Sequence, residues 1–132
     1  MSVFTAQELQ YLQGERRLAR LATVGPDGTP HIAPVGWRLR ALNSGTQVIE
    51  ITGIHLEKTK KFRDIARTHR AAIVIDDVLP PWRPRGIEIR GRAEALTDPE
   101  SLIRIYPERI VAWGLEGAGM DDRRARTIGA RE

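Results

Sequence analysis

The residues of this chain that are best suited to bind a ligand form one short cationic run. Residues 57–70 include six basic and two acidic side chains, so this window alone carries the net charge of +4. All three lysines of the protein lie in it, at Lys58, Lys60 and Lys61, with Thr59 between them. Ammonium groups and a hydroxyl at the start of a helix, where the helix dipole is positive, form a natural phosphate site. A solvated helix face has a similar composition, so the run by itself leaves both interpretations open.

The other reactive residue types show no arrangement that indicates catalysis by side chains. The chain has no cysteine, which excludes disulfides, thiolate metal sites and catalytic thiols. The three histidines are too far apart in the sequence to predict a metal site: His31, His55 and His69. Carboxylates such as Glu50, Asp76 and Asp77 are explained as turn and edge residues. We therefore assign no catalytic residue, and redox chemistry would have to come from a bound cofactor.

The elements that must position the cationic run begin with a short helix and a series of strands. Thr5 and Glu8 form a capping box, which predicts a helix over Ala6–Gln13. Apolar and β-branched runs between turn residues then predict three strands, over Leu18–Val24, Pro30–Arg40 and Val48–Thr52. The spacing of apolar residues changes to a helical period over Leu56–Arg67, so an amphipathic helix should carry the lysines.

The second half of the chain predicts further strands. Ala71–Asp76 is a short apolar strand, and the proline-rich segment Pro80–Gly86 is expected to be a stiff loop. Ile87–Ala95 alternates strictly between apolar and charged residues, and Leu102–Leu115 favours a strand over a helix. The segment 117–132 has little apolar periodicity and is expected to be a mobile or partner-dependent tail, which leaves one domain over residues 1–116.

These elements predict a mainly β fold with short helices (α+β), in which hairpin-connected strands form an antiparallel barrel. A barrel this small closes imperfectly, so a second copy is expected to cover its apolar surface in a homodimer. The first residues lack the pattern of a signal peptide, and no apolar run approaches the length that spans a bilayer. We expect a cytoplasmic protein with no membrane partner.

Four segments in this order resemble the pyridoxamine 5′-phosphate oxidase-like split β-barrel superfamily, and within it the branch of F420-dependent flavin/deazaflavin oxidoreductases. They are RLATVGPDGTPHIAPVGW at Arg20–Trp37, KKFRD at Lys60–Asp64, DDVLPPWRPRGIEIRGRAE at Asp76–Glu94 and PERIVAWG at Pro107–Gly114. The resemblance covers nearly the whole chain up to about Leu115. It implies an FMN-binding-like split barrel that is dimeric.

The resemblance also implies where a cofactor would lie. The flavin-type ring would rest at the dimer interface beside Pro34, Val35 and Gly36. The linker would pass Thr52 and Gly53, and the phosphate would be held by Lys58, Thr59, Lys60 and Lys61. The proline-rich loop is either a rigid plug or a wall over the cofactor, to which Trp82 and Arg85 would contribute.

The function implied by the resemblance is an F420-dependent oxidoreductase that transfers hydride between the reduced deazaflavin and a small unsaturated substrate. Two alternatives remain open at this point. One is an FMN-dependent oxidoreductase or oxidase of the same fold, and the other is a non-catalytic carrier or sensor of flavin, F420 or haem. Nucleic-acid binding is disfavoured because the hairpin strands lack an aromatic stacking platform.

Overall fold

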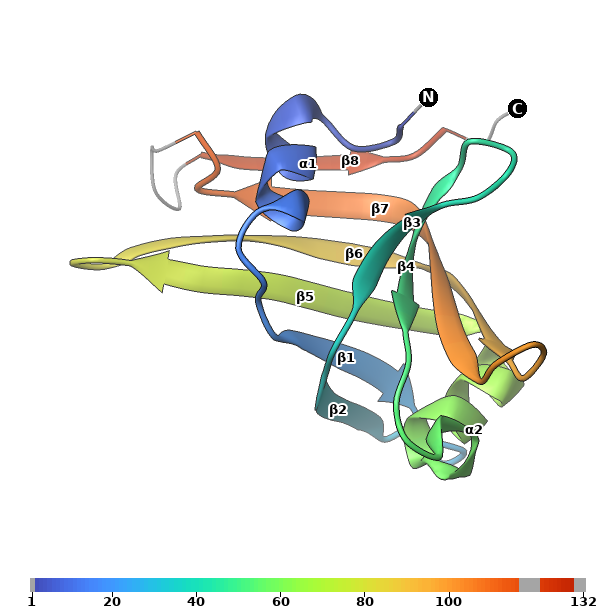
Figure 1. Cartoon of the computed structure of the whole chain (residues 1–132). Helices are drawn as coiled ribbons and strands as arrows, with labels where there is room; N and C mark the ends of the chain where they lie inside the picture. The colour runs from blue at the N-terminus through green and yellow to red at the C-terminus, as the bar shows by residue number, and fades with distance from the viewer. Residues whose placement is uncertain (1, 117–121, 130–132) are drawn as a thin grey trace.

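The computed structural model describes residues 2–116 and 122–129, which fold around one antiparallel sheet (Figure 1). The strands follow the order β2-β1-β5-β6-β7-β4-β3, and β8 pairs with β7. The elements are α1 (Ala6–Gln13), β1 (Ala19–Val24), β2 (Pro30–Val35), β3 (Arg38–Ala41), β4 (Gln47–Ile51), the 3-10 turn η1 (Leu56–Lys58), α2 (Lys60–Thr68), β5 (Arg70–Leu79), β6 (Arg83–Leu96), β7 (Leu102–Trp113) and β8 (Arg123–Thr127). The prediction of a mainly β, antiparallel fold with short helices is confirmed.

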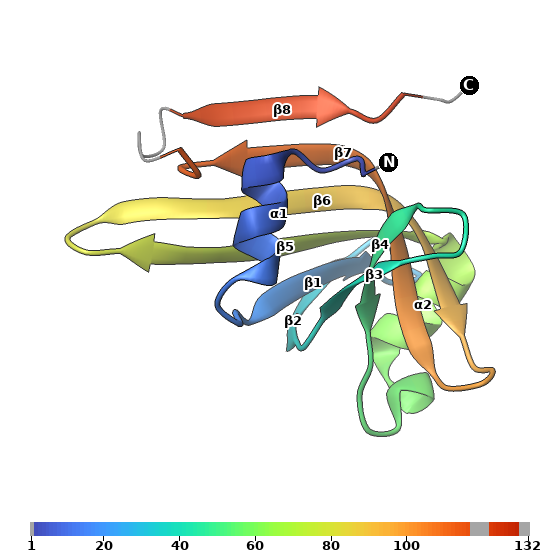
Figure 2. The same cartoon turned by 45° about the horizontal axis from the view of Figure 1, so that its top comes forward.

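The two ends of the strand order, β2 and β3, are neighbours in the sequence. Only Gly36 and Trp37 lie between them, yet β2 pairs with β1 and β3 pairs with β4. The sheet must therefore curl so that β4 and β3 fold back over one of its faces (Figure 2). The prediction of a single strand over Pro30–Arg40 was wrong at this point, because the chain leaves one sheet edge and enters the other. Trp37 anchors the crossing, since its indole N–H donates to the Arg17 carbonyl at 2.7 Å.

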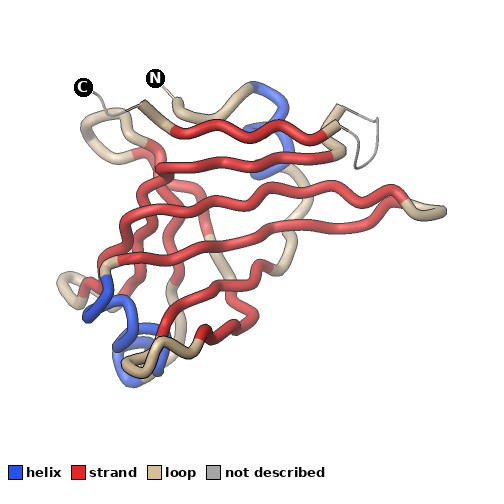
Figure 3. Tube along the Cα trace, turned by 180° about the vertical axis from the view of Figure 1, so that it is seen from behind, coloured by secondary structure: helices blue, strands red, loops and turns tan. Residues whose placement is uncertain are grey.

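The inner face of the curled sheet is built mainly from isoleucine. Alternating residues of β5, β6 and β7 point inward and are almost completely buried, as are Ile49 and Ile51 of β4. α2 adds Phe62 and Ile65 to the same core. Each buried aliphatic side chain of this size contributes about 2 kcal/mol to folding by leaving water. Figure 3 shows the stack of strands from behind, with α2 at the end where β1 and β2 lie.

The hairpin of β5 and β6 is longer than the sequence predicted. Pairing continues from Arg70↔Arg92 to Leu79↔Arg83, so only residues 80–82 form the turn rather than the whole of Pro80–Gly86. Pro84 is tolerated because β7 ends opposite Gly86, which leaves this part of β6 with a single neighbour, β5. The free end of the hairpin projects well beyond β1 and β2 (Figure 1).

A bulge between β6 and β7 explains how Pro107 fits inside a strand. The register shifts between Arg90 and Gly91, and Gly91 lies opposite Pro107. A Cβ atom on Gly91 would approach the Tyr106 carbonyl oxygen to 1.9 Å, so no larger residue fits there. The strand expected over Leu102–Leu115 is thus confirmed over Leu102–Trp113.

The predicted helix over Leu56–Arg67 is divided in two. Thr59 has extended backbone angles (φ −87°, ψ 158°) and caps α2 by accepting from the Phe62 amide. Lys58 therefore belongs to the preceding η1 turn, whereas Lys60 and Lys61 are the first residues of α2. The cap at Thr59 therefore places Lys58 in one element and Lys60 and Lys61 in another.

The first helix, α1, and the last strand, β8, are joined by hydrogen bonds. α1 has the predicted bounds and the predicted capping box of Thr5 and Glu8. The second half of the segment expected to be a tail is instead β8, and its Arg126 forms hydrogen bonds of 2.6 and 2.8 Å with the buried Glu8 carboxylate. Residues 117–121 and 130–132 of the predicted tail lie outside the described residues. Among those described, no helix is long and apolar enough to span a bilayer.

Candidate functional site

A pocket of about 210 Å³ lies where α2 meets β1 and the edge strand β2. It is lined by Leu21, Thr23, His31, Ile32, Ala33, Lys60 and Lys61. The structure thus brings together two of the four residues predicted to hold a phosphate, and it adds a histidine and a buried threonine.

Strand pairing explains why the β residues of this pocket share one face. Thr23 lies opposite His31, and Leu21 lies opposite Ala33. Residues directly opposite in an antiparallel pair project to the same side of the sheet. The Thr23 hydroxyl donates to Asp64 of α2 at 2.9 Å, so this is the side that α2 covers. The lysines at the start of α2 and the ring of His31 therefore meet over the same part of the sheet.

Asp64 connects α2 to β1 beside the pocket. Besides accepting from Thr23, its carboxylate lies 3.5 Å from the Lys60 ammonium and 3.5 Å from the Arg67 guanidinium. Burial alone would raise the pKa of Asp64, but the Thr23 hydrogen bond and the charges of Lys60 and Arg67 outweigh it, and the pKa lies below its ordinary value. Asp64 therefore stays ionised and holds Lys60 beside β1.

Two nitrogen-bearing side chains of the pocket take part in no hydrogen bond or ion pair among the residues that the structure describes. Within residues 2–116 and 122–129, neither the Lys61 ammonium nor the His31 ring takes part in a hydrogen bond or an ion pair. The lack of a side chain at Gly25 lets His31 and Lys60 approach the backbone closely, since a Cβ atom there would lie only 2.9 Å from His31 Nε2 and 3.2 Å from Lys60 Nζ. The pocket thus presents donor groups that are free to bind an anion.

The other residues predicted to hold a phosphate or linker lie outside this pocket. Lys58 is exposed on η1, and the Thr59 hydroxyl is engaged with the backbone, donating to the Leu56 carbonyl at 2.7 Å. Thr52 and Gly53 are exposed in the segment that follows β4. The lining of the pocket includes none of these four residues.

The residues predicted to lie beside the cofactor ring are at the end of β2, and none of them lines the pocket. Pro34 and Gly36 are exposed, and a Cβ atom on Gly36 would meet nothing within 4 Å. Val35 instead points into the core, where 6% of its surface remains exposed. The backbone at Gly36 is therefore open to the close approach of a flat group, while Val35 contributes to packing.

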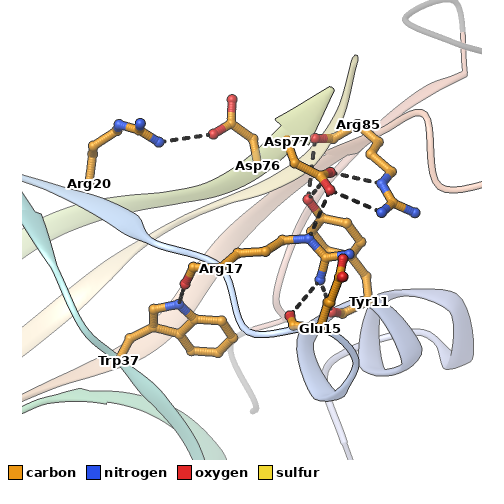
Figure 4. A network of polar contacts seen from close by, with 8 residues as sticks. All are labelled: Tyr11, Glu15, Arg17, Arg20, Trp37, Asp76, Asp77 and Arg85. Atoms are coloured by element: carbon orange, nitrogen blue, oxygen red, sulfur yellow. Dashed lines mark hydrogen bonds and ion pairs between the residues drawn. The ribbon is translucent and has the colours of Figure 1, made fainter. Parts of the chain in front are cut away.

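Trp82 lies in the turn between β5 and β6, and Arg85 pairs with Asp77 close to that turn. This end of the hairpin points away from α2 (Figure 1). The Arg85 guanidinium binds both oxygens of Asp77, at 2.8 and 3.0 Å. The Tyr11 hydroxyl donates to Asp77 at 2.8 Å, and Arg17 lies 3.2 Å from the same carboxylate (Figure 4). Trp82, by contrast, is 75% exposed. The structure of one chain does not bring Trp82 or Arg85 to the lysines.

The pKa values in this second cluster show how tightly its charges are matched. The hydrogen bonds from Arg85 hold the pKa of Asp77 well below its usual range, against the opposing effect of burial. Burial and the hydrogen bond to Asp77 raise the pKa of Tyr11 above its ordinary value. Asp77 is therefore ionised and Tyr11 neutral throughout the neutral pH range.

A second pocket, of about 230 Å³, lies on the opposite face of β1. It is lined mainly by small and apolar residues: Arg20, Ala22, Ile32, Ala72, Ile73, Val74, Glu88 and Trp113. Ile32 is common to both pockets and is 74% exposed. The edge strand β2 therefore separates a cationic pocket from an apolar one.

Several residues of these clusters were missed from the sequence. His31 and Thr23 could have been paired by counting outward from the turn at residues 25–28, and Asp64 lies four residues after Lys60 on one helix face. Glu50 was interpreted as an edge residue, but β4 lies between β3 and β7, and Glu50 is completely buried. Its two oxygens each accept a 2.9 Å hydrogen bond, one from Arg38 and one from Arg104. No group of three or more potential metal ligands occurs in the described part of the chain.

Comparison with known proteins identifies the family to which the chain belongs. The family model described as pyridoxamine 5′-phosphate oxidase matches residues 5–131. A 5a,11a-dehydrotetracycline/5a,11a-dehydrooxytetracycline reductase from Streptomyces rimosus subsp. rimosus is 39% identical over 140 residues, which cover 98% of this chain and 96% of that protein.

Two solved structures share the fold at low sequence identity. A heme binding protein from Mycobacterium smegmatis has a TM-score of 0.66 and 18% sequence identity. The match covers 94% of this chain and 58% of the length of that protein. A structure named F420 reductase has a TM-score of 0.57 and 23% identity, covering 76% of this chain and 94% of the other. The chain belongs to the pyridoxamine 5′-phosphate oxidase family and has its split-barrel fold.

Proposed function

We propose that the protein is an F420-dependent oxidoreductase whose cationic pocket holds the phosphate end of the cofactor. The observation that carries this proposal is the convergence of Lys60, the unpartnered Lys61 and His31 on one pocket beside Gly25. Free ammonium groups suit a phosphate, which accepts several charge-assisted hydrogen bonds.

The relatives support an oxidoreductase. The protein that is 39% identical over nearly its full length is named as a reductase, and a structural neighbour is named as an F420 reductase. The neighbour supports the fold only, so the choice of F420 over FMN is part of the proposal. The exposed cations Lys58 and Arg63, next to the pocket, would also attract the polyglutamate tail of F420.

In this proposal the residues of the chain bind, orient and exclude water, while the bound cofactor supplies hydride transfer. Lys60 and Lys61 hold the phosphate, and Asp64 keeps Lys60 in place. The ring would lie along the exposed end of β2, at Pro34 and Gly36. A second copy, covering the apolar pocket and the exposed Ile32, would exclude water in a homodimer.

The proposal is tested by cofactor binding and then by turnover. Wild-type protein should quench F420 fluorescence, and the double variant Lys60→Ala/Lys61→Ala should bind about 100-fold more weakly, because each lost charge-assisted contact is worth about 1.5 kcal/mol. The matched control Arg16→Ala/Arg123→Ala removes two exposed charges outside the pocket and should bind as the wild type does.

The alternatives predict different results in the same assays. Binding of FMN without F420 would favour the flavin alternative, and haem binding alone would favour a carrier or sensor. Failure to bind any of the three would refute the proposal. Oxidation of reduced F420 in the presence of conjugated small molecules then distinguishes an enzyme from a carrier.

A further inference from the structure

We infer that Trp82, in the turn of the β5–β6 hairpin, docks into the apolar pocket beside β1 of a second copy of this chain. This contact belongs to the homodimer of the proposed function, on which it rests. It also gives a role to a residue that the resemblance places in the wall over the cofactor, although a single chain does not bring Trp82 to the lysines.

Exposed apolar side chains gather on one side of the sheet. The even-numbered residues of β1, β2 and β5 share the side that faces away from α2. Val24, Ile32 and Val78 lie on that side and are 45, 74 and 45% exposed. Trp82, at the end of the same hairpin as Val78, is 75% exposed. A concentration of large apolar side chains on one face of a sheet is typical of a docking surface.

The apolar pocket in this face suits an aromatic side chain. Its volume is about 230 Å³, and the small side chains of Ala22 and Ala72 line it together with the larger Ile32, Val74 and Trp113. An indole that enters the pocket is removed from water on most of its surface and can pack against the ring of Trp113 in an offset or edge-to-face arrangement.

The charges around the pocket favour an uncharged occupant. Arg20 and Asp76 form an ion pair of 3.3 Å, and Arg90 and Glu88 form one of 2.8 Å. This surround is neutral, although the whole chain carries a net charge of +4. A nucleic acid or an acidic peptide would gain no attraction here. Paired charges also suit a contact between identical chains, in which an excess of one sign would face itself and repel.

The hairpin presents Trp82 on a stiff extension of the sheet (Figure 1). β1 pairs with β5 only as far as Ile75, and β7 pairs with β6 only as far as Gly86, so the rest of the hairpin is a two-stranded ribbon. Such a ribbon has little stability by itself. The Asp77 cluster supports one side of it, and the second copy supports the other. Because Pro80 and Pro81 already restrict the turn, docking of Trp82 loses little conformational entropy.

Two-fold symmetry allows two such contacts in one dimer. Val74, in the pocket, is six residues before the turn at Pro80, so the pocket and the tip of one chain are about 20 Å apart. Trp82 therefore cannot enter the pocket of its own chain. A two-fold axis about midway between them places each tip over the other pocket, which covers both tryptophans. Ile32 borders both pockets, so the docked Trp82 lies beside β2, next to the proposed position of the ring.

The first test measures dimer dissociation constants by sedimentation equilibrium, without cofactor. Trp82→Ala should weaken the dimer about 100-fold, because two contacts worth about tenfold each are lost. Ala72→Phe fills the pocket from its own chain and should weaken the dimer to a similar extent. Ile54→Ala is the matched control, because Ile54 is 91% exposed and lies in the segment after β4, and this variant should dimerise as the wild type does. Thermal melting identifies any variant that fails to fold.

The second test uses the absence of cysteine from the chain to determine which surfaces meet. Arg83→Cys, which keeps Trp82, and Ala22→Cys are purified separately, one of them with an affinity tag, and are mixed with a short bismaleimide cross-linker. A covalent dimer of one chain of each kind should form, and neither variant should link to itself. A mixture of Ala22→Cys with Ser44→Cys, in the β3–β4 turn, should give no linked dimer.

The outcomes separate the docking contact from the proposed cofactor. If Trp82→Ala dimerises as tightly as wild type, or if no mixed link forms, the docking is refuted while F420 binding by wild type still supports the proposed function. A link of Arg83→Cys to itself, or a wild type that stays monomeric, also refutes the docking, and a monomer leaves the pocket to a small molecule. If both tests succeed and wild type binds no F420, the docking stands and the proposed cofactor fails.

Discussion

Two clusters of charged residues in this molecule differ in how many of their partners the chain itself supplies. Near the turn of the β5–β6 hairpin, Asp77 is surrounded by Arg85, Arg17 and the Tyr11 hydroxyl (Figure 4). At the cationic pocket, Lys61 and His31 have no hydrogen bond or ion pair within the described residues. The charges of the hairpin cluster are matched within the folded chain, whereas the pocket keeps two nitrogen-bearing side chains that form no hydrogen bond or ion pair in the described residues.

The difference shows why charge type alone is a poor guide to function. Arg85 and Lys61 are both basic residues predicted to bind the cofactor, but Arg85 already has its anion. Both oxygens of Asp77 and the ring of Tyr11, with its centre 5.1 Å away, hold the Arg85 guanidinium in place. A ligand would have to displace these contacts, so the comparison predicts that the hairpin cluster governs stability and the pocket governs binding.

The largest expected effect on stability comes from Asp77→Ala. It leaves Arg17, whose side chain is only 10% exposed, without its carboxylate, and it also removes the partner of Arg85. We expect the free energy of unfolding to fall by about 3 kcal/mol, as for other disrupted ion pairs with a buried member. Urea denaturation measures this loss. Affinity for F420 should stay within about twofold of the wild-type value. A large loss of affinity in a variant that still folds would show that the hairpin cluster also governs binding.

Acid should weaken the same cluster. Because the pKa of Asp77 is lower in the folded protein than in the unfolded chain, its contribution to stability is complete above the unfolded value of about 3.9. It is lost as the pH falls below that value toward the folded pKa. Urea midpoints of wild type should therefore decline between about pH 4 and pH 2 more steeply than those of Asp77→Asn. Parallel declines would show that Asp77 does not contribute.

Tyr11→Phe should lower the unfolding free energy by a smaller amount, and it measures what the tyrosine hydroxyl contributes to the Asp77 cluster. The ring remains packed against the two arginines, while the hydroxyl loses its hydrogen bond to Asp77 and a longer one, of 3.4 Å, to the Arg85 carbonyl. A hydrogen bond to an ionised carboxylate is worth about 1.5 kcal/mol, so the unfolding free energy should fall by about that amount. Asp77→Ala in the Tyr11→Phe background should cost less than it does alone, which a double-mutant cycle measures.

Lys61→Gln should have the smallest effect on stability. Its ammonium has no partner to lose, so the unfolding free energy should change by less than about 0.5 kcal/mol. Affinity for F420 should nevertheless fall, and its dependence on salt should weaken, because one fewer cation contacts the phosphate. A clear loss of stability without a loss of affinity would contradict this prediction and would show that Lys61 contributes to folding rather than to binding.

The sequence predicted the local elements better than their junctions. α1 was found because its cap and its helix are set by adjacent residues such as Thr5 and Glu8. The break at Gly36 and Trp37 was missed because each half of that segment pairs with a different part of the chain. β8 was missed because its charged sequence is stabilised mainly by pairing with β7 and by the contact of Arg126 with Glu8.

The candidate site was predicted to a similar extent. Lys60 and Lys61 were selected from local charge density, and the structure places both in the lining of one pocket. His31 was missed because its approach to Lys60 depends on the space beside Gly25, which only the folded backbone defines. Lys58 was placed with the other lysines because the extended Thr59 that divides the helix has no clear signal in the composition.

The contact between Glu8 and Arg126 has a consequence for how the protein is made. The two residues are 118 positions apart, and Glu8 is buried with Arg126 as its ion-pair partner. During synthesis α1 emerges early, but the guanidinium that neutralises its buried carboxylate is translated much later. The ion pair between Glu8 and Arg126 therefore cannot form until β8 has left the ribosome, so this step of folding must follow the synthesis of all the other strands.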